Sequence, residues 1–489
     1  MVSRYIGVPD RFKELGVRTG IVRWIYGATL GSTVSSLEEA TKRLCSEGLA
    51  PWAISSGAVS GVSSKRLAIL NRIDAKFADL GYHRVLRAEL FPIEVRLGQV
   101  IPYMEASFSE ERVQLQQYLL LHRNGSMALS VCLELDEDEP VSMHDAVWLA
   151  SIGLQDTLLD YGLPPSGLIS RDSMSLGKSV DGEWIQDISL ETYMNRVVVP
   201  AIHYAVLRKR ITQSDHFGAV HPLSQYTVGV LVEGTPRCDD LQGFTAEYGT
   251  EVKSFSDMDL LGFSRAPKTV DERFAVDFSI DTEIGAFLGA RAGAIVFKWP
   301  GIGDWFAYVA HRYGVERRLD ACLEIYQHYA VFVEWALIEE ISLRSYLSRL
   351  APYIRQSNVS IQRLVEHKRQ MVSDLEEFLE GVSSFEYGVR IIDTVNRLRS
   401  VGELRERFRH KRTLIEEIVS ERENWRLQRL MLVLNVVLLT SLFLELSELA
   451  VQYYQVQPGS REWLVSKVVA VMVLPLLVVA YNLYKYTRR

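Results

Sequence analysis

Two apolar runs within residues 430–489 constrain this chain more than any other feature. The first is Leu430–Ala450 and the second is Trp463–Tyr484, with a short polar turn between them. Each run has about 20 residues, the length that an α-helix needs to cross a hydrocarbon core of about 30 Å. The alternative is a helical hairpin buried in a soluble core. We predict a C-terminal hairpin of two transmembrane helices, with the lipid bilayer as the first partner of the chain.

Basic residues flank the two runs on one side only. The connecting turn, residues 451–462, contains Arg461 as its one basic residue. Lys and Arg near the membrane ends favour the cytoplasmic side. We therefore expect a multi-pass protein of the cell membrane with both termini in the cytoplasm. The flanking basic residues are Arg405, Arg407, Arg409, Lys411, Arg412, Arg422, Arg426, Arg429, Lys485, Arg488 and Arg489.

Composition argues against several classes of function. The net charge is −7, and the basic residues gather beside the apolar runs, so we expect no nucleic-acid partner. The four cysteines are far apart, and the sequence has no CxxC motif and no combined Cys and His spacing of a zinc site. It also has no motif of a nucleophile, a metalloprotease or a phosphate-binding loop. We expect no enzyme and no organic cofactor, with a divalent cation as the one ligand left open.

The expected fold class is an α+β cytoplasmic domain, a long helical stalk and a C-terminal two-helix transmembrane hairpin. The pattern divides the chain into a cytoplasmic α/β domain (residues 1–240), a β-rich continuation of that domain (241–310), a helical, coiled-coil-like stalk (311–429) and the hairpin (430–489).

Local patterns predict several elements of the cytoplasmic domain. Asn124-Gly125 between two alternating apolar runs is a strong signal for a β-hairpin. The acidic run 136–139 is expected to form an exposed turn. The other predicted elements are a strand at 20–30, a helix at 37–46 capped by Ser36, the hairpin strands at 113–121 and 127–135, and a helix at 143–161.

The stalk shows apolar residues at helical spacing. One helix is expected at about 315–350, ending before Pro352. From Ile361 to about residue 429, apolar residues recur every three or four positions without a proline. This pattern predicts one very long helix that continues into the first apolar run, or two helices in a hairpin. Its apolar stripe needs a partner, either the 315–350 helix or further copies of the chain.

The order of these parts resembles the CorA family of membrane proteins. Members of that family have a cytoplasmic α/β domain, a long stalk helix that continues into the first span, a short external turn and a second span. The resemblance implies a homo-oligomer, a pentamer, with a pore lined by the first span. The family's Gly-Met-Asn motif after the first span is absent here, where the corresponding stretch reads Leu-Ala-Val-Gln-Tyr-Tyr-Gln. The resemblance therefore concerns architecture and does not imply magnesium transport.

Polar residues in the first apolar run are the candidate ion path. Ser441, Glu445 and Glu448 follow one another at i, i+4 and i+7, so they share one helix face. In a ring of identical helices this face would form an acidic collar that concentrates cations. The alternative is that both glutamates only reach toward the headgroups. Asn435 lies deeper and is expected to face a pore or to bond a neighbouring helix.

Two further groups of charged residues are candidates for ion pairing or metal binding. Lys467, one turn into the second run, is expected to reach the interface or to pair with Glu445 or Glu448. Asp277, Asp281 and Glu283 form a small acidic cluster that is a weak candidate for a metal site, because hard cations prefer carboxylate oxygens. A solvated turn is the alternative for this cluster.

These observations lead to two hypotheses of function. The first is an oligomeric CorA-like channel, transporter or membrane effector that is gated by its cytoplasmic domain. The second is a membrane-anchored interaction or scaffold protein whose hairpin only tethers it. A membrane-tethered enzyme is a weaker third, because no reaction chemistry is visible in the sequence.

Overall fold

The chain forms two compact units in the computed structural model. One unit comprises residues 1–351 and 370–408, and the other comprises residues 352–369 and 409–489. The structure describes residues 13–55, 58–61, 85–96, 112–149, 158–162, 180–181, 184–208, 218–225, 228–233, 243, 246–248, 276–277, 284–288, 293–298, 303–316, 318–355, 365, 369, 372, 386–453 and 459–468.

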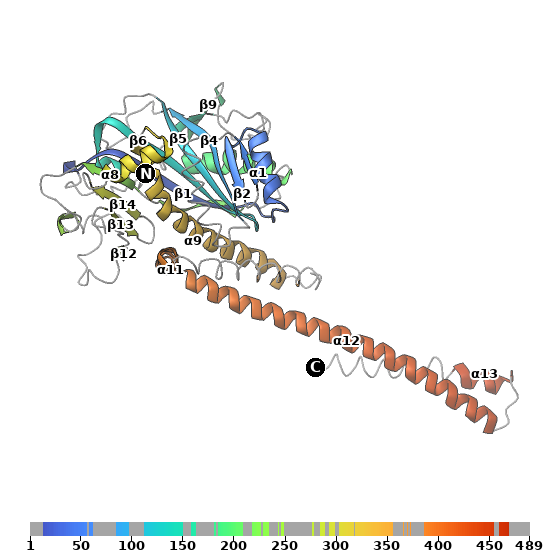
Figure 1. Cartoon of the computed structure of the whole chain (residues 1–489). Helices are drawn as coiled ribbons and strands as arrows, with labels where there is room; N and C mark the ends of the chain where they lie inside the picture. The colour runs from blue at the N-terminus through green and yellow to red at the C-terminus, as the bar shows by residue number, and fades with distance from the viewer. Residues whose placement is uncertain are drawn as a thin grey trace. The chain divides into compact units, whose positions relative to one another are not determined.

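The first unit is built on one curled β-sheet (Figure 1). Its strand order is β12-β13-β14-β11-β1-β6-β5-β4-β7-β9-β8, with β10 also pairing with β1, and with β2 pairing with β3 and β4. All pairs are antiparallel except β11 with β14. The strands are β1 (Gly16–Thr29), β2 (Trp52–Ser55), β3 (Ala58–Gly61), β4 (Val85–Arg96), β5 (Arg112–His122), β6 (Ser126–Ser142), β7 (Leu159–Gly162), β8 (Val180–Asp181), β9 (Trp184–Ile188), β10 (Gly218–Gln225), β11 (Val228–Glu233), β12 (Val276–Asp277), β13 (Ile284–Leu288) and β14 (Gly293–Lys298).

Helices cover both faces of this sheet. The described helices are α1 (Leu37–Ser46), α3 (Met143–Trp148), α5 (Leu190–Tyr193), the π-helix η5 (Met194–Val198), α6 (Val199–Leu207), α8 (Gly303–Tyr313), α9 (Arg318–Arg355), α11 (Glu386–Leu398), α12 (Val401–Tyr453) and α13 (Arg461–Val468). In β1, Val22, Trp24 and Tyr26 pack in one core with α1 and α6. The intervening Ile21 and Ile25 pack in a second core with α9 and α11. A sheet that is buried on both faces explains why its central strands are apolar at nearly every position.

The hairpin predicted at Asn124-Gly125 is confirmed. Strands β5 and β6 pair from Leu121 opposite Met127 along the ladder to Leu115 opposite Leu133. Gly125 has φ 86°, a left-handed conformation that glycine adopts without the penalty of a Cβ. Asn124 supports the turn, because its side-chain oxygen accepts a hydrogen bond of 2.8 Å from the backbone N–H of Ser126.

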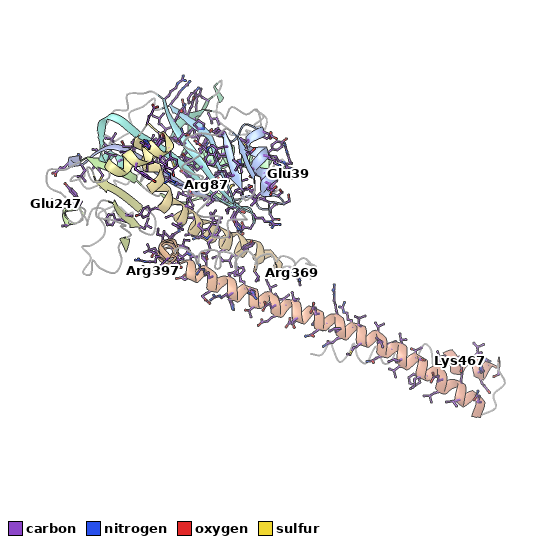
Figure 2. The ribbon with its side chains drawn as sticks, viewed as in Figure 1. Glu39, Arg87, Glu247, Arg369, Arg397 and Lys467 are labelled. Carbon is purple, nitrogen blue, oxygen red and sulfur yellow. The ribbon has the colours of Figure 1, made fainter. Side chains whose placement is uncertain are left out.

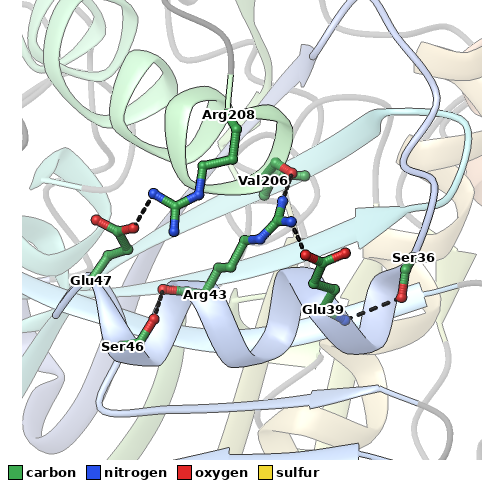
Figure 3. Close-up of polar contacts among 7 residues, drawn as sticks. All are labelled: Ser36, Glu39, Arg43, Ser46, Glu47, Val206 and Arg208. Carbon is green, nitrogen blue, oxygen red and sulfur yellow. Dashed lines mark hydrogen bonds and ion pairs between the residues drawn. The ribbon is translucent and has the colours of Figure 1, made fainter.

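The helix predicted at 37–46 is also confirmed, with its cap. Ser36 Oγ accepts a hydrogen bond of 3.2 Å from the Glu39 N–H, as an N-cap residue does (Figure 3). Arg43 pairs with Glu39 and donates to the carbonyl of Val206, which lies at the end of α6. Arg208, in the left-handed conformation that ends α6, pairs with Glu47. These contacts hold α1 and α6 together on one face of the sheet.

Two predictions in the first unit are wrong. The helix expected at 143–161 is found only at its start, where α3 covers Met143–Trp148; residues 150–157 lie outside the described part of the chain, and Leu159–Gly162 forms strand β7 instead. Tyr161 explains this outcome, because it pairs with β4 and β9 and its buried ring stacks on Tyr193 with ring centroids 5.0 Å apart. Tertiary pairing overrides the local pattern there. The acidic run 136–139 is part of β6 rather than a turn. It lies at a bulge, because Val17 pairs with Val141 and Thr19 pairs with Asp136, so β6 has more residues than β1 between these two pairs.

The helical region also differs from its pattern. Helix α9 passes through Pro352 and is described as far as Arg355, so the prediction that it ends before this proline is wrong; a proline removes one backbone hydrogen bond of a helix, and the helix tolerates that loss here. The prediction of a single helix over 361–429 is wrong, because α11 ends at Leu398 and α12 begins at Val401. Ser400 between them has φ 54°. Of residues 361–385, most lie outside the described part of the chain.

Helix α12, with 53 residues, is the longest element in the described part of the chain. At 1.5 Å per residue it spans about 80 Å. The predicted continuity between the charged segment and the first apolar run is confirmed, because no break occurs between Val401 and Tyr453. Figure 2 shows its side chains extending from the helix along much of its length.

Candidate functional site

The apolar half of α12 exposes large side chains on most sides. Ten of them are between 51% and 68% exposed, an arrangement that is unfavourable in water. Among the described residues, α12 is the one helix long and apolar enough to cross a membrane, and none of its most apolar window is buried. This helix is consistent with a membrane association. The ten side chains are Leu427, Leu430, Met431, Val433, Leu434, Val437, Leu438, Leu442, Leu446 and Leu449.

The predicted ion-path residues are all exposed on this part of α12. Ser441, Glu445 and Glu448 fall within about 60° of one another around the axis, at 100° per residue. Asn435 is about 120° from Ser441, so the helix does not bring it to the same face. The candidate site is therefore the triplet of Ser441, Glu445 and Glu448, which we call the acidic face.

Within the acidic face, Glu445 lies opposite a partly covered stripe of the same helix. Leu432, Val436, Leu439 and Phe443 are half-buried, at alternating spacings of four and three residues. Glu445 is nine residues after Val436, which is about 180° around the helix. No ion pair involves Glu445 within the described residues.

Glu448 pairs with the start of the second apolar run. Its Oε1 lies 2.8 Å from Nζ of Lys467 in α13, as the sequence suggested for one of the two glutamates. Ser460 caps α13 by accepting a hydrogen bond of 3.2 Å from the N–H of Trp463. Lys467 Nζ is also 6.0 Å from the ring centroid of Trp463. Residues 469–489, most of the predicted second span, lie outside the described part of the chain.

The proposed acidic metal cluster has little support. Asp277 is in β12, where it pairs with Phe287 of β13, while Asp281 and Glu283 lie outside the described residues. Across the described ranges, no group of three or more His, Cys, Asp or Glu side chains is arranged to hold a metal ion.

A buried polar network, which sequence reasoning missed, surrounds the start of α12 in the first unit. Glu339 of α9 is 1% exposed. Its carboxylate accepts a hydrogen bond of 2.6 Å from Nε of Arg405 in α12 and one of 2.9 Å from the amide of Asn396 in α11. Burial raises the pKa of Glu339, and Asp393 adds to this effect, while Arg405 and Asn396 lower it. One carboxylate thus ties the first turns of α12 to two other helices.

The next residue of α9 holds the junction between α11 and α12. Glu340, also 1% exposed, pairs with Arg399 just before the left-handed Ser400. It also pairs with Arg344 at 2.8 Å. One turn along α12 from Arg405, the ring of Phe408 packs near Tyr346 of α9, with centroids 6.4 Å apart.

A third buried acid connects α9 to the sheet. Glu334 pairs with Arg23 of β1, and both side chains are almost fully buried. Ser130 of β6 joins them, because its Oγ accepts a hydrogen bond of 2.6 Å from Arg23 and donates one of 2.7 Å to Glu334. The three carboxylates of α9 therefore connect the sheet, α11 and the base of α12. We call this set the α9 network: Arg23, Ser130, Glu334, Glu339, Glu340, Asn396, Arg399 and Arg405.

A signal for this network exists in the sequence. In the stretch Val331–Leu343, the glutamates 334, 339 and 340 interrupt an otherwise apolar helix. Charged residues inside such a run need buried partners, but periodicity does not identify those partners. They include distant positions such as Arg23, which is 311 residues before Glu334 (334 − 23).

Comparison with known proteins adds no relative. No family model matches the chain, and no curated protein matches it at a significant level.

Proposed function

We propose that this chain is an oligomeric membrane protein of CorA-like arrangement, working as a cation channel or transporter. The observation that carries the proposal is the position of Glu445. It is exposed on α12, has no ion pair within the described residues and lies opposite the half-buried stripe of that helix. In a ring of α12 helices, this acidic face would line a central path, and the ten exposed apolar side chains would meet lipid or neighbouring copies.

The energetic argument depends on depth. If the span begins at Leu430, Glu445 lies about 22 Å further along the helix axis, and the hydrocarbon core is about 30 Å thick. A charged side chain in a lipid-facing position costs up to about 3 kcal/mol at the centre of a bilayer and less toward its surface. A water-filled path shared by several copies removes that cost, since the carboxylate stays hydrated.

The proposed topology has two spans, residues 430–450 and 463–484, with both termini in the cytoplasm. The support is the basic flank of the first run, the Ser460-capped start of α13 and the Glu448–Lys467 pair. The α9 network would then control the path. Because α12 is continuous, a change at Glu339 and Arg405 would be carried along one helix to Glu445.

The first test is the mass of the full-length protein in detergent, corrected for bound detergent. An assembly of four to six copies supports a central path, whereas a monomer has too few α12 helices to enclose one. Flux of monovalent and divalent cations into liposomes follows. We expect Glu445→Gln to reduce cation flux about tenfold, and Glu421→Gln, an exposed change on the same helix before the apolar run, to leave it unchanged.

The tether hypothesis gives different results. If an unrelated two-helix anchor replaces residues 430–489 and the cellular activity persists, the hairpin only holds the protein at the membrane. Equal flux for native protein and Glu445→Gln would also remove the ion-path proposal.

A further inference from the structure

We propose that the last two arginines before the apolar run, Arg426 and Arg429, bind the phosphate groups of anionic lipids. This inference rests on the proposed insertion of α12 in a membrane and does not require that α12 conduct ions. The two arginines are three residues apart, so they share one face of α12. The apolar run begins at Leu430, immediately after the last of them.

Upstream arginines of the same helix have acidic partners. Arg407 lies 3.7 Å from Glu403, and Arg412 lies 3.2 Å from Glu416, each pair at i, i+4 spacing. By contrast, Arg426 and Arg429 make no ion pair within the described part of the chain. Among the described residues, the arginines of α12 without an acidic partner are thus the two next to its apolar half.

This section of α12 is also uncovered by the rest of the described chain. Phe408 and Ile415 are buried on the upstream part of the helix. From residue 423 to residue 431, every side chain is exposed, including Trp425 at 53%. A ligand therefore has access to the arginines from any side.

The chemistry and the position identify this ligand as a lipid headgroup. Arg binds phosphate through two parallel hydrogen bonds, which makes it the preferred residue for this group. Trp425, one turn before Arg429, suits the same interfacial depth, because Trp concentrates at the level of the headgroups. Basic residues at an anionic membrane surface each contribute about a fivefold increase in association.

The test measures lipid preference with the full-length protein. The protein is reconstituted in phosphatidylcholine vesicles that contain a trace of fluorescent phosphatidylglycerol or fluorescent phosphatidylcholine, and energy transfer from tryptophan reports how much of each lipid adjoins it. We expect phosphatidylglycerol to be enriched over phosphatidylcholine, and 0.5 M NaCl to weaken this enrichment. In the double variant Arg426→Gln/Arg429→Gln, the enrichment should fall at least fivefold.

The matched control is Arg407→Gln/Arg412→Gln, which removes the same charge from the same helix at ion-paired positions. It should keep the enrichment. Equal transfer to both lipids in the native protein, or unchanged enrichment in the Arg426/Arg429 variant, would overturn the proposal. Flotation with the vesicles after carbonate washing tests membrane insertion separately, because protein that does not float is not inserted. Protein that floats and prefers phosphatidylglycerol but conducts no ions would refute only the channel proposal.

Discussion

The buried pair of Arg23 and Glu334 offers the sharpest test of how α9 is held on the sheet. Both side chains are at most 2% exposed, and Ser130 makes one hydrogen bond with each of them. In Glu334→Ala, the Arg23 guanidinium would stay buried without its carboxylate. Removing one partner of a buried pair costs about 3–5 kcal/mol, because the remaining charge is uncompensated.

The expected change in melting temperature follows from the size of the unit. The first unit has roughly 390 residues, and an unfolding entropy of about 2.1 cal/mol/K per residue makes 1 kcal/mol equal to about 1.2 °C. Glu334→Ala should therefore lower the melting temperature of the full-length protein in detergent by about 4–6 °C, as followed by circular dichroism.

Two controls make the reasoning refutable. The double variant Arg23→Met/Glu334→Leu removes both charges and keeps the volume, so it should recover most of the loss. Glu403→Ala breaks the ion pair with Arg407, in which both side chains are about 70% exposed. It should change the melting temperature by less than about 1 °C. If Glu334→Ala behaved like Glu403→Ala, or if the double variant were no better than Glu334→Ala, the argument from buried charge would be wrong.

Three further predictions concern single positions. Burial raises the folded-state pKa of Glu339 above its unfolded value near 4.5, so the stabilisation from its protonated form is complete below pH 4.5 and is lost as pH rises through the folded-state pKa. Between pH 4.5 and 8, the melting temperature of the native protein should therefore fall relative to that of Glu339→Gln. A difference in melting temperature that stays constant over this range would contradict the prediction. Gly388→Ala would place a Cβ 2.1 Å from Cε1 of Phe332 and should destabilise the protein by about 1–3 kcal/mol, whereas Gly402→Ala meets nothing within 4 Å and should be neutral or slightly stabilising in the same thermal melts. Ser36→Ala removes the cap of α1 and should cost about 1 kcal/mol in urea unfolding, while restoration of the loss by Asp at the same position would confirm that the cap is responsible.

Local signals in the sequence identified the elements that local forces decide. The cap at Ser36, the turn at Asn124-Gly125 and the apolar run after Arg429 each depend on residues within one or two turns of chain. For this reason α1, the β5–β6 hairpin and the apolar half of α12 are found where the patterns place them. The i, i+4, i+7 spacing of Ser441, Glu445 and Glu448 follows from helix geometry alone and is preserved in the structure.

Errors occurred where distant residues compete with local preference. The segment ending at Gly162 has a helical pattern at its start, yet Tyr161 is drawn into the sheet by β4 and β9. The apolar stripe from Ile361 onward has continuous helical spacing, yet the helix is interrupted at Ser400. Glu340 pairs with Arg399 at that point, an interaction that no local pattern contains.

The sequence by itself determined that the chain ends in membrane-length apolar runs with basic flanks, because hydropathy and charge are properties of the residues themselves. Only the tertiary structure decided which charges are buried together, because the partners of Glu334, Glu339 and Glu340 come from β1, α11, α12 and the turn between α11 and α12. Buried charges must be paired to be tolerated, and pairing depends on how distant segments pack. The α9 network is therefore a property of the fold, while the acidic face of α12 is a property of the sequence.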